Sequence, residues 1–196
     1  MEAVIKKTAL LLLIVAVGLV QADVLFEEDF DSGDLDSWTL EPGEIGQRWI
    51  ISSQRYYNPA YGVICEEGDQ QDERLISPPI NLTDNCELTF HWAASYTWLV
   101  TPHNNGDYSL EIRQAGGPGA WVSRWNEELV GVFENWTWYE TTIAIDDYWE
   151  GFDVQFAWRL IGDNAADVWL DTIILTDDAS TGVEETSFGQ INALGR

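Results

Sequence analysis

Lysine is almost absent from this sequence. The only lysines are Lys6 and Lys7, so seven of the nine basic residues are arginines, against 34 aspartates and glutamates. The formal net charge is −25 over 196 residues. A surface this acidic repels phosphate-bearing polymers and anionic headgroups. The composition therefore argues against nucleic acid and anionic membranes as partners.

Residue patterns that mark common enzymes are missing too. The chain contains two histidines and two cysteines, and it has no C-x-x-C pair, no H-E-x-x-H and no G-x-S-x-G. Glycosidases need two carboxylates at a set separation, and the nearest acidic cluster, residues 146–150, matches no such strand motif. We therefore expect no catalytic activity, with His91 and His103 as ordinary surface residues.

Long apolar runs are absent except for one near the start. Residues 8–20 are almost entirely apolar, they follow Lys6 and Lys7, and small residues end the segment at Ala22. This pattern is typical of a secretory signal peptide over residues 1–22. The alternative is a membrane anchor, but a spanning helix needs about 20 apolar residues. We expect cleavage, no membrane insertion afterwards, and an extracellular or cell-surface protein.

Removing the signal peptide leaves one domain-sized chain. Glu2, Lys6 and Lys7 contribute +1 to the total of −25, so the remaining chain carries about −26. Eleven tryptophans and an aromatic content of 13% predict a packed core rather than disorder. We expect a domain over residues 23–178 and a linker-like tail over residues 179–196, where small and polar residues replace the alternating pattern.

The cysteines of an exported protein are expected to pair. Cys65 and Cys86 both fall in predicted strands, so we expect one disulfide between them. The alternative is a pair of buried free thiols.

Alternation of apolar and polar residues predicts strands throughout. Leu88, Phe90 and Trp92 alternate with polar residues, as do residues 108–113 and 152–160. Residues 168–175 are apolar on both faces, as in a central strand. Short strands, frequent turn residues and no amphipathic helix predict an all-β, two-sheet antiparallel jelly-roll sandwich.

Four segments in order resemble a known family. Residues 26–33 give a strand and an acidic turn, followed by Trp38. Residues 75–82 read L-I-S-P-P-I-N-L and precede E-L-T-F-H-W. The other two are Trp136 with residues 141–145, and residues 168–175. Together they resemble the MAM-like jelly-roll modules of bacterial secreted proteins, of the cleaved-adhesin or choice-of-anchor J type. The resemblance implies a non-catalytic binding module, although Thr172 replaces the second acid usual in the closing strand.

The resemblance also implies a structural calcium ion. In related jelly-roll carbohydrate-binding modules the ion joins the first and last strands, which makes Asp31 and Asp171 the candidate ligands here. Asp29 is a further candidate through its carbonyl, and Asn58 through its loop. The sequence adds a physical reason, because a carboxylate inside the apolar segment at Asp171 needs a cation or several donors. The alternative is that Asp171 pairs with an arginine or accepts backbone N–H bonds.

Sugar binding is the function that we expect first. Exposed aromatic rings stack on pyranose rings, and the candidates are the aromatic residues outside the strand alternation. Most aromatic residues, however, serve packing. The strongest candidates are Trp98, Trp121, Trp125 and Tyr57, with Asn104 supplying an amide near Trp98. Others are Tyr56, Trp138 and Trp149.

The sequence thus predicts a secreted module that recognises carbohydrate or a surface glycan and is held rigid by calcium. Two alternatives stay open. One is an adhesive domain that contacts proteins and has no sugar site. The other is an accessory domain of a larger secreted hydrolase.

Overall fold

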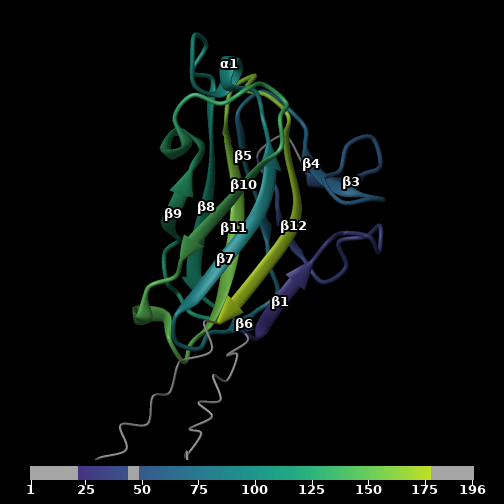
Figure 1. Ribbon diagram of the computed structural model, residues 1–196. Helices are drawn as coiled ribbons and strands as arrows, with labels where there is room; N and C mark the ends of the chain where they lie inside the picture. Colours follow the sequence, from purple (N-terminus) through teal and green to yellow (C-terminus); the bar gives the residue numbers. More distant parts are fainter. Residues whose placement is uncertain (1–21, 44–48, 178–196) are drawn as a thin grey trace, which may run out of the picture.

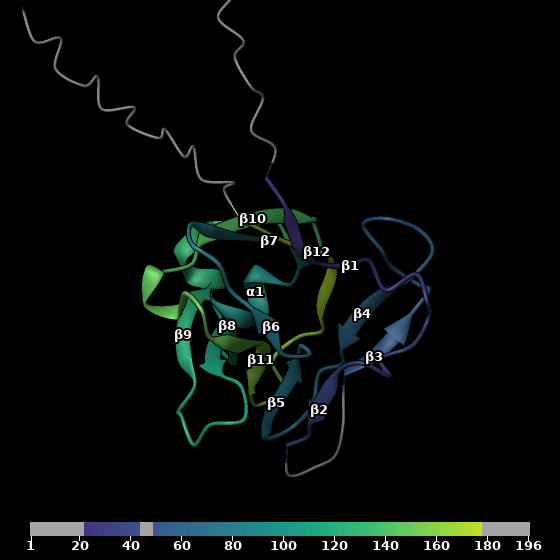
Figure 2. The same cartoon turned by 90° about the horizontal axis from the view of Figure 1, so that it is seen from below.

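Two antiparallel β-sheets pack face to face in the computed structural model, which describes residues 22–43 and 49–177. Figure 1 shows the two layers, and Figure 2 shows them from below, with β1, β12, β7 and β10 along one side and β2, β5, β11 and β8 along the other. The predicted jelly-roll sandwich is confirmed. The predicted signal peptide (apart from Ala22) and the predicted tail from residue 179 lie outside the described residues.

The first sheet, sheet A, brings the first and last strands together. Its strand order is β10-β7-β12-β4-β3, and β1 pairs with β12. Both ends of the described chain meet at one end of this sheet, where the Asp177 N–H donates to the Asp23 carbonyl at 3.0 Å. The strands of sheet A are β1 (Val24–Glu28), β3 (Trp49–Ser52), β4 (Gly62–Cys65), β7 (Cys86–Ala93), β10 (Tyr139–Ala144) and β12 (Val168–Asp177).

The second sheet, sheet B, forms the other layer. Its order is β2-β5-β11-β8-β9, and β6 pairs with the start of β11. The strands of sheet B are β2 (Thr39–Glu41), β5 (Gln71–Ile76), β6 (Ile80–Asn81), β8 (Gly106–Gln114), β9 (Val122–Asn126) and β11 (Asp153–Gly162).

Three short helical turns connect strands within residues 22–43 and 49–177. They are α1 (Tyr96–Leu99), η1 (Glu127–Val130) and η2 (Asp147–Trp149). No helix in the described part of the chain has the length and apolar character needed to cross a membrane.

The core is made by the inward residues of the alternating strands. Leu88, Phe90 and Trp92 of β7 are fully buried, as the sequence pattern predicts. Edge-to-face contacts join these rings across the sandwich, with ring centroids 5.2 Å apart for Phe90 and Trp125 and 5.6 Å apart for Phe90 and Trp158. Such contacts add to the area that the rings bury.

A β-bulge in β12 explains why residues 168–175 read as apolar on both faces. The pairing with β7 shifts between Asp171 and Ile173, and Thr172 has a φ of 45°. Leu170 before the bulge and Ile173 after it therefore both point into the core. Asp171 points to the outer face of sheet A, where a loop covers it.

The predicted disulfide between Cys65 and Cys86 is wrong. Neither cysteine forms a disulfide, and both side chains are buried. Cys65 pairs with Val168 and Cys86 with Asp177, at opposite ends of β12. At about 3.3 Å per residue the two cysteines lie roughly 30 Å apart, whereas a disulfide needs Cα atoms within about 7 Å. Cys65 ends β4 and Cys86 begins β7. The sequence alone does not show that these two positions lie at opposite ends of the sheet.

Candidate functional site

The aromatic residues predicted to contact a ligand lie in three separate places. Trp98 is on α1 at one end of the sandwich, and Trp121 precedes β9 at the outer face of sheet B. Tyr57 lies on the β3–β4 loop, where it stacks on His91 of sheet A. Asn104 is exposed near Trp98 but lines a different depression. The structure therefore does not gather these predicted residues into one site.

Trp125 is a correction to the prediction, because its ring is in the core. It packs against Phe90 and Trp92, with ring centroids 5.2 and 5.1 Å away. A register shift between Leu110 and Glu111 pairs Trp125 with Leu110 and turns it inward. Trp149 is buried as well.

Asp171 anchors the loop that joins β3 to β4. Its Oδ2 atom accepts the backbone N–H groups of Tyr57 at 2.6 Å and Asn58 at 3.0 Å. Its Oδ1 atom accepts the N–H and the hydroxyl of Thr172 at 2.6 and 3.2 Å. Burial raises the pKa of Asp171, and these hydrogen bonds oppose that shift. We expected this carboxylate to be satisfied either by a cation or by several hydrogen-bond donors, and the structure contains the donors.

The other predicted calcium ligands are near the same loop. Asp31 accepts the Ala60 N–H through Oδ1 at 2.5 Å, and Asp29 accepts the Asp31 N–H at 3.0 Å. A carboxylate offers about four lone-pair positions, and Asp171 uses four for protein donors. This arrangement does not favour Asp171 as a metal ligand. Among the described residues no three His, Cys, Asp or Glu side chains cluster to hold a metal. The calcium ion stays a prediction.

His91 is buried, contrary to the prediction. Its ring stacks on Tyr57 with centroids 3.7 Å apart and an interplanar angle of 18°. Its Nδ1 atom lies 3.4 Å from the Thr172 carbonyl, and its Nε2 atom lies 3.3 Å from Glu140. His91 does occupy the polar side of β7, but the loop held by Asp171 covers that side. A distant loop therefore buries a residue that the strand pattern alone leaves exposed.

The outer face of sheet B holds a connected set of interacting polar side chains. Strands β5, β8 and β11 turn Leu75, Leu110 and Trp158 into the core. Their charged residues Arg74, Glu111 and Arg159 lie on the opposite face, where they contact one another. We call this set the arginine face. It comprises Glu41, Asp72, Arg74, Glu111, Arg113, Trp121, Gln155 and Arg159.

Glu111 is at the centre of the arginine face. Its Oε2 atom accepts from Arg74 Nε at 2.7 Å, and its Oε1 atom accepts from Arg159 Nη1 at 3.3 Å. Arg159 also makes a two-bond contact with Asp72, at 2.6 and 2.8 Å, and Arg74 contacts Glu41 at 2.8 Å. Each arginine therefore bridges two carboxylates, which fixes its planar group in one orientation.

Trp121 lies at one edge of the arginine face. The Arg113 guanidinium lies 4.1 Å from the centre of the Trp121 ring, and Arg74 lies 5.9 Å from it. Arg113 also donates to Gln155 Oε1, through Nη2 at 3.2 Å. The face thus presents an indole, an amide and fixed N–H donors together.

Several of these charges are shielded from water. Only 12% of the Arg74 side chain and 9% of the Glu111 side chain is exposed. Hydrogen bonds from Arg159 lower the pKa of Asp72, and Asp72 in turn raises the pKa of Arg159. Asp72 and Arg159 are therefore both charged at neutral pH. Removing a charge from water costs free energy, and apolar residues in the same positions often stabilise a fold as well as buried ion pairs or better.

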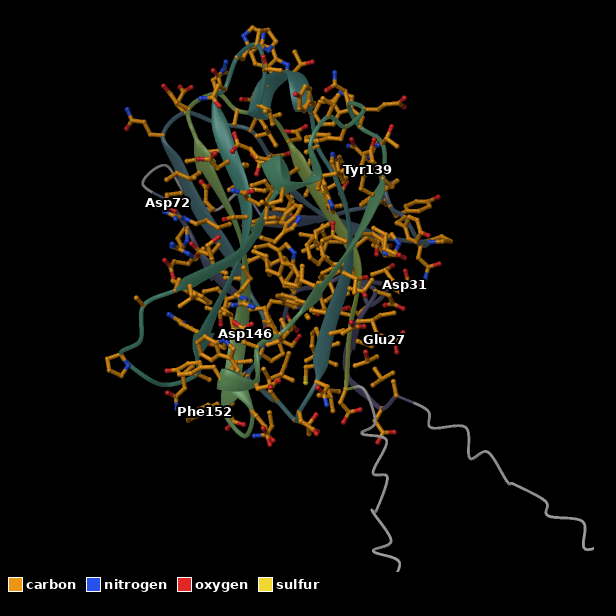
Figure 3. All side chains as sticks on the ribbon, turned by 60° about the vertical axis from the view of Figure 1, so that its left-hand side comes forward. Glu27, Asp31, Asp72, Tyr139, Asp146 and Phe152 are labelled. Carbon is orange, nitrogen blue, oxygen red and sulfur yellow. The ribbon has the colours of Figure 1, made fainter. Side chains whose placement is uncertain are left out.

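Sequence reasoning found only Trp121 of this face. The charged residues alternate along their strands, so each one reads as an ordinary solvent-facing residue. Their grouping depends on which strands pair, and Asp72 and Arg159 are 87 residues apart in the sequence. Figure 3 shows Asp72 on the opposite side of the molecule from Asp31 and Tyr139, so the arginine face and the Asp171 loop are separate regions.

Comparison with known proteins identifies the fold. The sequence matches no protein-family model and no curated protein. The structure is similar to the K3 cleaved adhesin domain of Lys-gingipain from Porphyromonas gingivalis. The TM-score is 0.57 at 20% identity, over 80% of this chain and 99% of that one.

Carbohydrate-binding modules share the architecture as well. The CBM22-1 xylan-binding domain of Xyn10C from Paenibacillus barcinonensis has a TM-score of 0.55 at 12% identity, covering 81% of this chain and 97% of its own. The CBM27-1 module of Caldicellulosiruptor saccharolyticus, solved with mannohexaose, has a TM-score of 0.55 at 16% identity, covering 81% and 98%. At these identities the likeness establishes the β-sandwich fold.

Proposed function

We propose that this protein is a secreted, non-catalytic module of the MAM-like type that binds a neutral glycan on the arginine face. The observation that carries the proposal is the position of the Trp121 ring beside Arg113, which donates to Gln155, and Arg74, which Glu111 and Glu41 hold in place. Adhesin and carbohydrate-binding modules with the same fold support a binding role.

The chemistry of the arginine face suits a sugar. Paired hydroxyl groups accept from guanidinium N–H groups and donate to carboxylates, and both kinds of partner occur here in fixed positions. The half-buried Trp121 ring offers an apolar surface for the C–H side of a pyranose. Because the ion pairs hold the side chains before binding, little side-chain entropy is lost when the ligand arrives.

Charge points to a neutral ligand. The three guanidiniums of the arginine face are matched by three carboxylates, those of Glu41, Asp72 and Glu111. The chain as a whole carries −25, so an anionic polysaccharide would be repelled on approach.

A catalytic role is disfavoured by the same geometry. A glycosidase needs a carboxylic acid whose pKa is raised, so that it can protonate the leaving group. Asp72 has a lowered pKa because Arg159 donates to it, and Glu111 is held between two arginines.

Binding to neutral polysaccharides tests the proposal directly. We suggest affinity electrophoresis and titration calorimetry with xylan, mannan and β-1,4-galactan, comparing the parent protein with Trp121→Ala and Arg113→Ala. Tyr148→Ala removes an exposed ring elsewhere and is the matched control. We expect the first two variants to lose about ten-fold or more in affinity, or roughly 1.4 kcal/mol. Equal binding by Trp121→Ala and the parent would reject the arginine face as the site.

An adhesive protein–protein role is the second candidate. Its specific support is an exposed aliphatic segment that includes η1 and the residues just after it, in which Leu129 is 72% and Val132 is 83% exposed. Two results together would favour this role. The protein would show no affinity for any glycan, and the double variant Leu129→Ser with Val132→Ser would lose adhesion. An accessory position beside a hydrolase would be compatible with either one.

Calcium has its own test. If an ion binds between Asp31 and Asp171, the melting temperature must rise with added calcium by mass action, and Asp31→Asn must abolish the rise. Equal melting temperatures in excess EGTA and in excess calcium would mean that no calcium binds there and that hydrogen bonds alone satisfy the Asp171 carboxylate.

A further inference from the structure

A cavity lies at the α1 end of the sandwich, away from the arginine face. It has a volume of about 240 Å³, and Trp98 and Trp136 form part of its lining. These rings are 38% and 39% exposed, which is unusual for such large apolar groups. Figure 1 places α1 at the end of the sandwich opposite the start of β1 and the end of β12.

The two tryptophan-bearing segments are tied together by one side chain. Asn135 accepts the Thr97 N–H at 3.1 Å and the Ser95 hydroxyl at 3.2 Å, and its amide donates to the Thr97 hydroxyl at 2.9 Å. The Trp136 N–H donates to the Ala94 carbonyl at 2.8 Å. These bonds hold together the two backbone segments that carry the rings.

The Trp98 ring is held further by a stack. His103 lies against it, with ring centroids 4.2 Å apart and an interplanar angle of 16°. The Asn105 N–H donates to the Trp98 carbonyl at 2.9 Å. The segment after α1 thus folds back on the helix and supports the wall of the cavity.

The opposite wall is polar and acidic. Asp167 accepts the Glu67 N–H at 2.9 Å, and the Asn164 N–H donates to the Gly68 carbonyl at 2.9 Å. Asn105 ties this wall to the first by donating to the Asn164 carbonyl at 2.9 Å. Of the seven described residues that line the cavity, Glu67 and Asp167 are acidic and none is lysine or arginine.

We propose that this cavity binds an ammonium group carried on a small apolar or pyranose frame, such as a choline group or an amino sugar. Indole faces attract cations, and the two carboxylates and the net charge of the chain add to that attraction. The volume is below the roughly 300 Å³ of a typical ligand pocket, so the cavity suits one ring-sized group. The arginine face is electrically balanced, whereas this cavity selects positive charge.

Calorimetric titration with four small molecules tests the proposal. Choline chloride and glucosamine carry the cation on different frames and distinguish a quaternary ammonium from an amino sugar, and glucose and N-acetylglucosamine are neutral controls. We expect saturable binding of at least one cation, about ten-fold or more tighter than either neutral sugar. Equal affinity for glucose and glucosamine, together with no choline binding, would overturn the proposal.

Two variants locate the binding in the cavity. Asp167→Asn removes the charge but keeps an oxygen for the Glu67 N–H, so the fold is expected to remain, and cation affinity should fall about ten-fold. Trp136→Ala should abolish it. Trp121→Ala should leave it unchanged while weakening polysaccharide binding, so the two sites can fail independently. Unaltered cation affinity in Asp167→Asn would place the binding elsewhere.

Discussion

The carboxylate of Asp171 accepts the backbone N–H of Tyr57 at 2.6 Å, across 114 residues of sequence. Tyr57 in turn stacks on His91, which is opposite Asp171 in the β7–β12 pair. One acidic residue in the last strand therefore fixes the β3–β4 loop on the outer face of sheet A and buries a histidine beneath it.

Removing Asp171 should release this loop. In Asp171→Ala the N–H groups of Tyr57, Asn58 and Thr172 lose their acceptor, and we expect a loss of about 2 kcal/mol in the free energy of unfolding. Hydrogen exchange at Tyr57 and Asn58 should accelerate before global unfolding. Asp31→Ala is the control, because it removes an acceptor from Ala60 alone. Unchanged exchange at Tyr57 would show that the loop is held by other contacts.

The contributions of Arg74 and Glu111 to the free energy of unfolding should be strongly coupled. In a double-mutant cycle with Arg74→Ala and Glu111→Ala, measured by urea unfolding, we expect a coupling energy of about 1–3 kcal/mol because both groups are shielded from water. The Arg124–Asp146 pair is the matched control, since 61% of the Asp146 side chain is exposed, and its coupling should be much smaller. Equal couplings would remove the argument that the arginine face is prearranged.

The pH dependence of stability should report on Glu127. Its carboxyl is buried, with Oε2 accepting the Tyr108 N–H at 2.9 Å, and burial raises its pKa from 4.5 to about 7. A raised folded-state pKa stabilises the fold below the unfolded pKa, and that stabilisation is lost as pH rises through the folded one. The difference between a pKa of 4.5 and one of about 7 corresponds to roughly 3 kcal/mol of stability.

Glu127→Gln isolates this effect. Glutamine can still accept from Tyr108 but does not ionise, so the variant should lose less stability than the parent between about pH 5 and pH 8. Urea unfolding at several pH values measures the difference. Parallel curves for the two proteins would mean that Glu127 titrates as an ordinary glutamate.

The two cysteines should behave as buried thiols that form no disulfide. We expect a thiol reagent to label neither residue quickly in the native protein and both in denaturant, because Cys65 and Cys86 are buried. Adding a reducing agent should leave the melting temperature unchanged. If fewer than two thiols are labelled in denaturant, the prediction of a disulfide between the two cysteines would stand again.

The alternation of apolar and polar residues determined the sandwich. The alternation in residues 86–92 and 152–160 predicts which side chains face inward, and the structure buries the apolar side chains of β7 and β11 accordingly. Phe152, just before β11, is the exception, because it is 41% exposed. Period two fixes the face of each residue because successive side chains on a strand point to opposite sides. Fold class, strand positions and much of the core were thus predictable from sequence alone.

Strand order and loop placement were decided only by the tertiary structure. The bulge at Thr172, the inward turn of Trp125, the separation of Cys65 from Cys86 and the meeting of Arg74 with Glu111 all depend on which strands pair and in what register. A local pattern gives the direction of a side chain but not its neighbour on the next strand. The candidate site is made of such neighbours, so it emerged only when the chain was folded.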